Sequence, residues 1–296
     1  MIEIPPSGQA CGATVRGIDL SQPLAPEDVA IIREAWLQHH VLSFPDQRMT
    51  DDDLERYTLA FGGFGNDPFI APIPGREHII AVERQADETS PLFAENWHSD
   101  WSFQAQPPSG TCLYGIEIPP IGGDTLFANQ HAALEAMSDK QRARIDGLMA
   151  IHSAKRAYAP DGFYGEGDKA KRSMDIRPSR EAEAVQRHPL VRKHPETGRK
   201  ALFVSEWMCT GIVGMSDEEG RGIIDFLCRH STREEFMFRQ RWQVGDVLMW
   251  DNRATVHMAL ADYPRDAHRE LLRTSITGSP SGRIVDSSML ERSVTA

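Results

Sequence analysis

Residues 96–103 read Asn96-Trp97-His98-Ser99-Asp100-Trp101-Ser102-Phe103 (NWHSDWSF). Polar residues among aromatic ones in a short run predict a half-buried β-strand. Successive side chains of a strand point to opposite faces, so His98 and Asp100 are expected to share one face. A neutral imidazole beside a carboxylate is a mixed nitrogen and oxygen set suited to iron, manganese or zinc. The stretch therefore predicts two ligands of a metal centre.

A third ligand is needed, because a histidine and an aspartate two residues apart also occur by chance. His257 is the best placed of the remaining histidines: it lies in 250–263 (WDNRATVHMALADY), directly after the expected strand 246–252. Strand ends and loops are where functional sites are commonly built. The sequence separation of Asp100 and His257 is 257 minus 100, or 157 positions, so the site requires the whole fold. Three protein ligands would form a facial triad with open positions on the metal.

The rest of the chain reads as short strands with helices on either side. Strand-like runs bounded by Pro and Gly turns lie at 77–84, 110–118, 122–129, 189–206, 235–252 and 270–278. Helical periodicity occurs at 25–40, 50–63, 138–151 and 216–230, where Thr50, Ser138 and Ser216 are expected to cap three of the helices. Strands do not alternate regularly with helices, and no glycine-rich phosphate loop is present. The pattern predicts a mainly β fold with flanking helices, an antiparallel sandwich or jelly roll.

The chain shows no internal repeat and no linker, so one domain spanning 1–296 is expected. Residues 153–187 are polar, charged and rich in Gly and Pro, which is typical of a long surface loop. We interpret this segment as an insertion or lid.

Composition narrows the class of partner. The formal net charge of −11 argues against a nucleic-acid-binding surface. No apolar run is long enough to span a bilayer, and the first residues lack a signal-peptide pattern, so we expect no membrane partner and a cytoplasmic location. The four cysteines form no C-x-x-C pair, which indicates neither a zinc knuckle nor a disulfide framework.

Five separated motifs resemble the taurine dioxygenase and aryloxyalkanoate dioxygenase family of Fe(II), 2-oxoglutarate-dependent oxygenases. They are WHSD (97–100), GGDTLF (122–127), HPETGRKALFV (194–204), WDNRATVH (250–257) and HRELLRTSITG (268–278), in the family's order. The opening segments 12–24 and 41–47 are also similar. The resemblance implies a double-stranded β-helix, the cupin-like jelly roll.

The resemblance also implies cofactors and roles. His98, Asp100 and His257 would bind Fe(II), and Thr125 and Arg269 would hold the distal carboxylate of 2-oxoglutarate. Dioxygen would be the co-substrate, and an aliphatic carbon of the substrate would be hydroxylated with release of succinate and CO2. Family members that halogenate have a small residue at the Asp100 position, so hydroxylation is favoured. A homo-oligomer, a dimer or tetramer, is expected because family lids often pack near subunit contacts.

The resemblance further implies that Arg273 meets an acidic group of a small anionic substrate: a sulfonate, aryloxy acid, amino acid or related carboxylate. Asp67 and Ile70 occupy positions where taurine enzymes carry a histidine and a tyrosine, and Ala94 and Met208 also differ from polar and aromatic counterparts. These departures argue against taurine. Asp67 would line the substrate site with Met208 and pair with an amino group, or it is simply a turn residue before Pro68.

Two other functions fit part of the pattern. A zinc or manganese metallohydrolase could use the same three metal ligands, but it gives no role to Thr125 and Arg269. A non-catalytic jelly-roll binding protein could keep the scaffold. Titration with 2-oxoglutarate distinguishes both from the dioxygenase.

Overall fold

The largest sheet forms the centre of the molecule. The computed structural model describes residues 1–169 and 172–280, and its six-stranded sheet has the spatial order β1-β2-β12-β4-β14-β3. Its strands are β1 (Ala13–Thr14), β2 (Val41–Phe44), β3 (Ile80–Arg84), β4 (Gly110–Glu117), β12 (Val247–Asp251) and β14 (Arg269–Ile276). β1 pairs with β2 in parallel and every other pair is antiparallel.

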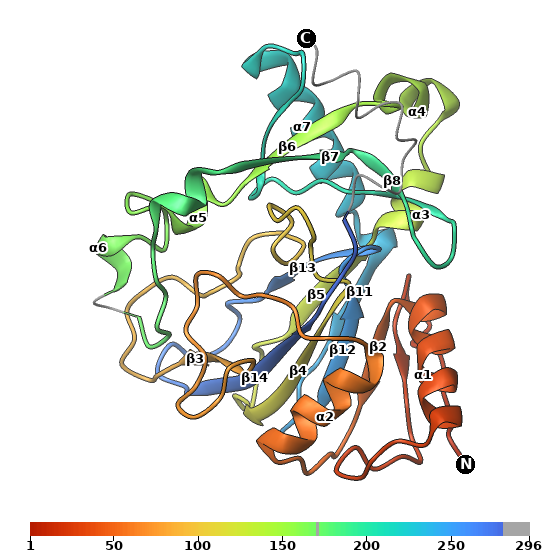
Figure 1. The fold of residues 1–296 in the computed structure, drawn as a ribbon, viewed down its shortest axis with the longest axis vertical. Coiled ribbons are helices and arrows are strands. Elements are labelled where there is room, and N and C mark those ends of the chain that lie inside the picture. The colour runs from red at the N-terminus through yellow and green to blue at the C-terminus, as the bar shows by residue number, and fades with distance from the viewer. Residues whose placement is uncertain (170–171, 281–296) are drawn as a thin grey trace.

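A smaller antiparallel sheet packs against one face of the large one. Its order is β11 (Met237–Gln240), β5 (Thr125–Asn129) and β13 (Thr255–Ala259). Phe127 and Phe238 of this sheet belong to one buried cluster with Leu248, Trp250 and Leu271 of the large sheet. The labels β5, β11 and β13 lie beside β4, β12 and β14 in Figure 1.

Two helices cover the opposite face of the large sheet, α1 (Pro26–His39) and α2 (Asp51–Phe61) (Figure 1). Trp36 and Tyr57 of these helices belong to a buried cluster with Val247 and Met249 of β12. Alternate side chains of β12 thus enter two different cores, which explains why this strand is apolar along most of its length.

The remaining elements form a layer above the two sheets (Figure 1). Its strands form the antiparallel sheet β10-β6-β7 and the hairpin β8-β9. The strands are β6 (Met149–Ser153), β7 (Val185–Pro189), β8 (Val191–Lys193), β9 (Lys200–Leu202) and β10 (Cys209–Ile212). The helices are α3 (Gln130–Glu135), α4 (Asp139–Ile145), α5 (Lys155–Tyr158), α6 (Glu166–Lys169), α7 (Asp217–Ser231), and the 3-10 helices η1 (Arg180–Glu183) and η2 (Glu234–Phe236).

The helices predicted at 25–40, 50–63 and 216–230 are confirmed, as is the hairpin in 189–206. The helix predicted at 138–151 extends only to Ile145, and residues 149–153 form strand β6 instead. Thr50, Ser138 and Ser216 each form a reciprocal capping box with the residue three positions later. The fold is a mixture of helices and several sheets, with more helix than the mainly β expectation. None of the described helices is long and apolar enough to cross a membrane.

The segment 153–187 differs from the expectation of a surface loop poor in core residues. Tyr158, Tyr164, Met174 and Ile176 are all buried and belong to one apolar cluster. Tyr158 stacks on Phe69, with ring centroids 5.1 Å apart. The segment is polar on average, but its few large apolar side chains are buried and anchor it to the rest of the protein.

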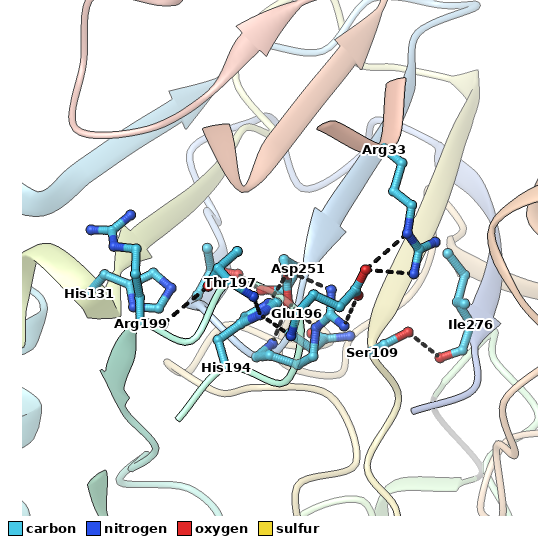
Figure 2. A network of polar contacts seen from close by, with 12 residues as sticks. Arg33, Ser109, His131, His194, Glu196, Thr197, Arg199, Asp251 and Ile276 are labelled. Atoms are coloured by element: carbon cyan, nitrogen blue, oxygen red, sulfur yellow. Dashed lines mark hydrogen bonds and ion pairs between the residues drawn. The ribbon is translucent and has the colours of Figure 1, made fainter. Parts of the chain in front are cut away.

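A network of charged side chains centred on the buried Asp251 joins the hairpin β8-β9 to the large sheet (Figure 2). Nε2 of His194 lies 2.9 Å from Oδ2 of Asp251, and Arg253 donates three hydrogen bonds of 2.8 Å to Asp251. Glu196 accepts from Arg253 at 2.6 Å and from Arg33 of α1 at 2.9 Å. The network thus fixes the end of β12, the strand that leads toward His257.

Candidate metal centre

The three predicted ligands lie together at the edge of the small sheet. Nε2 of His98 is 3.6 Å and Nε2 of His257 is 3.7 Å from Oδ1 of Asp100. One ligand atom of each residue can be chosen so that all lie within 4.8 Å of one another, and all three residues are buried. In the described residues no other group of His, Cys, Asp or Glu meets this criterion.

The backbone that brings them together is not the strand that the sequence predicts. His98 forms an isolated antiparallel bridge with His257, with N–H to carbonyl distances of 3.0 and 2.8 Å. Residues 100–103 then form a turn, and Trp101 has a φ of +45°. The expected strand is therefore wrong. His98 is held by its backbone pairing with His257, which is distant in sequence, and Asp100 lies in the turn that follows.

The protonation states suit a divalent metal. Nδ1 of His98 lies 2.7 Å from the carbonyl oxygen of Asn96, which only accepts, so Nδ1 carries the proton and Nε2 offers its lone pair. Burial lowers the pKa of His257 to about 3, so this imidazole is neutral at pH 7. Burial alone would raise the pKa of Asp100, but His257, His98 and Arg273 outweigh it and hold the pKa well below its usual range. Two imidazoles and one carboxylate are a ligand set for iron(II) or a similar ion.

Arg269 lies buried beside the segment that carries Thr125. Its guanidinium donates to the carbonyl oxygen of Gly123 at 3.0 and 3.3 Å, and no carboxylate among the described residues lies within 4.0 Å. Burial lowers the pKa of Arg269 to about 10, which still leaves it cationic at pH 7. Gly123 has a φ of +72°, and a Cβ there would lie 3.2 Å from Nε of Arg269. Thr125 accepts a hydrogen bond of 3.0 Å from Trp242.

Arg273 and Asp67 are brought together as partners of each other. The Nη2 group of Arg273 donates to Oδ1 of Asp67 at 2.6 Å. Trp101 donates to the same oxygen, and Ser275 donates to Oδ2 at 3.2 Å. Asp67 is therefore not the free receptor for an amino group that the sequence interpretation allowed, because three protein donors already hold its carboxylate.

The family model for taurine catabolism dioxygenase TauD, TfdA family, matches residues 3–275. The chain belongs to this family. It is an oxidoreductase of the dioxygenase class, and Fe(II) and 2-oxoglutarate are the cofactors of the family. The resemblance carried by the sequence motifs is thereby confirmed.

Relatives with named activities are similar along most of their length. An alkylsulfatase of Acinetobacter baylyi is 33% identical over 268 residues, which cover 90% of this chain and 82% of the relative. An alpha-ketoglutarate-dependent sulfate ester dioxygenase of Pseudomonas putida is 31% identical over 287 residues, which cover 96% and 93%.

Two solved structures are also similar to this chain. A taurine dioxygenase from Burkholderia xenovorans has a TM-score of 0.78 at 33% identity, and the match covers 94% of this chain and 91% of the other. AAD-2 in complex with Mn(II) and N-oxalylglycine has a TM-score of 0.75 at 29% identity, with coverage of 95% and 99%.

Met208 lies in an apolar cluster beside this TauD-type centre, buried with Trp101 and Tyr158. Ile70 and Phe69 belong to the same cluster, which we name the aromatic cluster. The full set of its buried residues is Phe69, Ile70, Ile80, Phe93, Trp101, Ala154, Ala157, Tyr158, Ala159, Tyr164, Met174, Ile176, Ala182 and Met208.

Two polar residues that support Asp100 were missed by the sequence analysis. Thr111 of β4 donates to Oδ2 of Asp100, and Asn252 donates to Thr111 at 2.9 Å. Asn252 also accepts from Trp250 at 2.9 Å. Asn252 stands inside the motif WDNRATVH, which is the one signal that pointed to it; nothing in the sequence around Thr111 did.

Proposed function

We propose that His98, Asp100 and His257 bind Fe(II) in this protein and that Arg269, with Thr125, holds the distal carboxylate of 2-oxoglutarate. The observation that carries the proposal is the coexistence of a buried His, Asp and His cluster with a buried arginine that has no carboxylate partner among the described residues. A buried guanidinium favours a charge-assisted, paired contact with a carboxylate. The metallohydrolase alternative gives Arg269 no such task.

The substrate would be a small organic anion. Relatives named for sulfate esters and for 2,4-dichlorophenoxyacetate share about a third of their residues with this chain. Arg273 is the cation that would bind this anion. Its guanidinium is buried and interacts electrostatically with Asp100 of the candidate metal centre. The aromatic cluster, which contains Trp101 and Met208, would pack against the apolar part of the substrate.

When bound, Fe(II) with 2-oxoglutarate and dioxygen supplies the oxidising power that hydroxylates an aliphatic carbon, with release of succinate and CO2. The residues of this chain would orient that carbon and exclude water, because the ligands and the aromatic cluster are buried. If the hydroxylated carbon also carries a sulfate or ether oxygen, the product breaks down and releases that group.

We also propose an architecture, a lid and an assembly for this enzyme. The two packed sheets would be the halves of a double-stranded β-helix, with residues 1–296 as a single domain. The segment 153–187 would act as a lid over the aromatic cluster, to which it contributes Tyr158 and Tyr164. The active form would be a homo-oligomer.

The test is an anaerobic titration of the apo protein with Fe(II) and then with 2-oxoglutarate, following the weak visible charge-transfer band of the bidentate complex. The wild-type protein is expected to give the band, and His98→Ala is expected to lack it because one of three ligands is gone. Binding of Fe(II) without any band on addition of 2-oxoglutarate would contradict the roles of Thr125 and Arg269 and favour the metallohydrolase.

A further inference from the structure

Arg273, the residue proposed to bind the acidic group of the substrate, already forms an ion pair with Asp67. Its side chain is 6% exposed and that of Asp67 is 12% exposed, and the two are joined by the 2.6 Å contact between Nη2 and Oδ1. The centre of the Arg273 guanidinium also lies 5.2 Å from the ring centroid of Trp101. The pair is thus a buried, charge-assisted hydrogen bond rather than a solvent-screened contact.

Asp67 is held in place by more than Arg273. Trp101 donates to Oδ1 and Ser275 donates to Oδ2, so both carboxylate oxygens are hydrogen-bonded. Nε of Arg273, in contrast, is buried without a hydrogen-bond partner in the described part of the chain. The carboxylate is satisfied, while the guanidinium keeps donor capacity that Asp67 does not use.

A substrate anion would bind to these unused N–H groups of Arg273, and Asp67 lies beside them. A paired contact of a carboxylate or sulfate with a guanidinium uses two adjacent nitrogens, and Nη2 belongs to both of the edges that can form one. An anion seated on either edge therefore brings its oxygens next to Oδ1 of Asp67. Like charges at that separation repel each other, and burial strengthens the repulsion.

We propose that Asp67 competes with the acidic group of the substrate for Arg273 and thereby determines which anions the enzyme accepts. The proposal rests on the function proposed above and adds a residue that sets its specificity. Asp67 weakens the binding of compact anions that approach Arg273, because such a ligand must displace the carboxylate or sit beside it. Substrates whose apolar part makes large contacts with the aromatic cluster can overcome that penalty.

The variant Asp67→Asn tests the charge with little change of shape. Asparagine keeps an oxygen that can accept from Trp101 or Arg273 but removes the negative charge. The dissociation constant of hexyl sulfate is measured anaerobically on protein loaded with Fe(II) and 2-oxoglutarate, using tryptophan fluorescence. The neutral probe 1-hexanol is measured in parallel. We expect Asp67→Asn to bind hexyl sulfate at least about 10-fold more tightly, with 1-hexanol unchanged.

The matched control is Asp53→Asn in helix α2, which removes the charge of another aspartate bonded to an arginine, Arg56 at 2.6 Å. It is expected to leave both dissociation constants unchanged. If Asp67→Asn does not fold, Asp67→Ser also removes the negative charge and keeps a side-chain oxygen that can accept a hydrogen bond; it is expected to tighten hexyl sulfate binding in the same direction.

An unchanged or weaker affinity of Asp67→Asn for hexyl sulfate overturns the proposal and makes Asp67 a structural clamp for Arg273. Equal changes for hexyl sulfate and 1-hexanol also overturn it, because the pocket has then changed shape rather than charge. Failure of the proposed function is distinguished by the visible band: it would be absent in the wild-type protein before either probe is added.

Discussion

The hydroxyl of Thr111 donates a 2.6 Å hydrogen bond to Oδ2 of Asp100, while Oδ1 of the same carboxylate faces the two histidines. One oxygen is thus tied to the protein and the other is left for a metal. The hydroxyl of Thr111 itself accepts from Nδ2 of Asn252 at 2.9 Å, so its proton is directed to Asp100. The arrangement fixes the orientation of the one anionic ligand.

Thr111→Val should weaken Fe(II) binding while the three ligands stay present. Valine has nearly the same shape, but it leaves Oδ2 of Asp100 and Nδ2 of Asn252 buried without their partner. Residues that orient metal ligands typically contribute about 10- to 100-fold in metal affinity, and we expect a loss in that range. The measurement is a competitive anaerobic Fe(II) titration.

The control is Thr58→Val, which removes another fully buried threonine hydroxyl, one bonded to Leu54 and Thr274. Both variants should lose roughly 1 to 3 kcal/mol of unfolding free energy. Only Thr111→Val should lose Fe(II) affinity. Equal Fe(II) affinities in the two variants would show that Thr111 stabilises the fold without orienting Asp100.

Arg269→Lys should raise the KM for 2-oxoglutarate and leave Fe(II) binding intact. Lysine keeps the charge but cannot present two parallel donors to a carboxylate. Losing one of two hydrogen bonds to a charged group costs about 1.5 to 3 kcal/mol, so the KM should rise at least about 10-fold. Succinate formation at varied 2-oxoglutarate gives the KM. Arg172→Lys, a change at another buried arginine, should leave it unaltered, and a similar rise in that control would refute a specific role for Arg269.

Local signals predicted the starts of three helices, because each capping box rests on neighbours in sequence. Thr50 and Asp53 form their capping box within one turn of helix α2, and the same holds for Ser138 and Ser216. The sequence could bring together the three candidate ligands because His98 and Asp100 are close in sequence and His257 follows a recognisable strand.

The features that the sequence did not predict correctly depend on contacts between residues that are distant in sequence. Asp67 and Arg273 are 206 positions apart, so no local pattern shows that they pair. The turn at Asp100 arises because the backbone of His98 pairs with that of His257, 159 positions away (257 minus 98). In 153–187, the average composition is polar, so it does not reveal the few buried aromatic residues that pack this segment against the protein.

The apo protein should lose stability in mild acid through His40. Burial lowers the pKa of His40 to about 3, against roughly 6.5 in the unfolded chain. The unfolded state therefore binds the proton first as the pH falls, so this contribution is complete above pH ~6.5 and is lost from there toward pH ~3. His40→Asn removes the titrating group at a position whose φ of +65° asparagine tolerates.

Denaturant unfolding of both apo proteins at pH 7 and pH 4.5 tests this. The decrease in unfolding free energy should be smaller in His40→Asn by about 2 to 3 kcal/mol. The neighbouring His39 is only half-buried, and burial lowers its pKa as well, so His39→Asn should reduce the pH dependence by a smaller amount than His40→Asn. Parallel pH profiles for wild type and His40→Asn would rule out His40 as a source of the acid sensitivity.

Asp251→Asn should destabilise the fold more than any surface charge change, because the residue is the centre of the network in Figure 2. Both nitrogens of the His194 ring are committed: Nδ1 accepts from the backbone of Glu196 and Thr197, so Nε2 donates to Asp251. Burial alone would raise the pKa of Asp251, but Arg253 and His194 hold it well below its usual range, which shows that the ionised form is the one the site stabilises.

Removing that charge leaves Arg253 buried with Glu196 as its remaining carboxylate partner, and breaking a buried pair in this way costs about 3 to 5 kcal/mol. Denaturant unfolding at pH 7.5 measures the loss. The partly exposed pair of Asp225 and Arg221, 3.8 Å apart, supplies the control: Asp225→Asn should cost less than about 1 kcal/mol. A loss as small in Asp251→Asn would mean that the hairpin β8-β9 is held by its apolar contacts and that the ion pairs add only specificity.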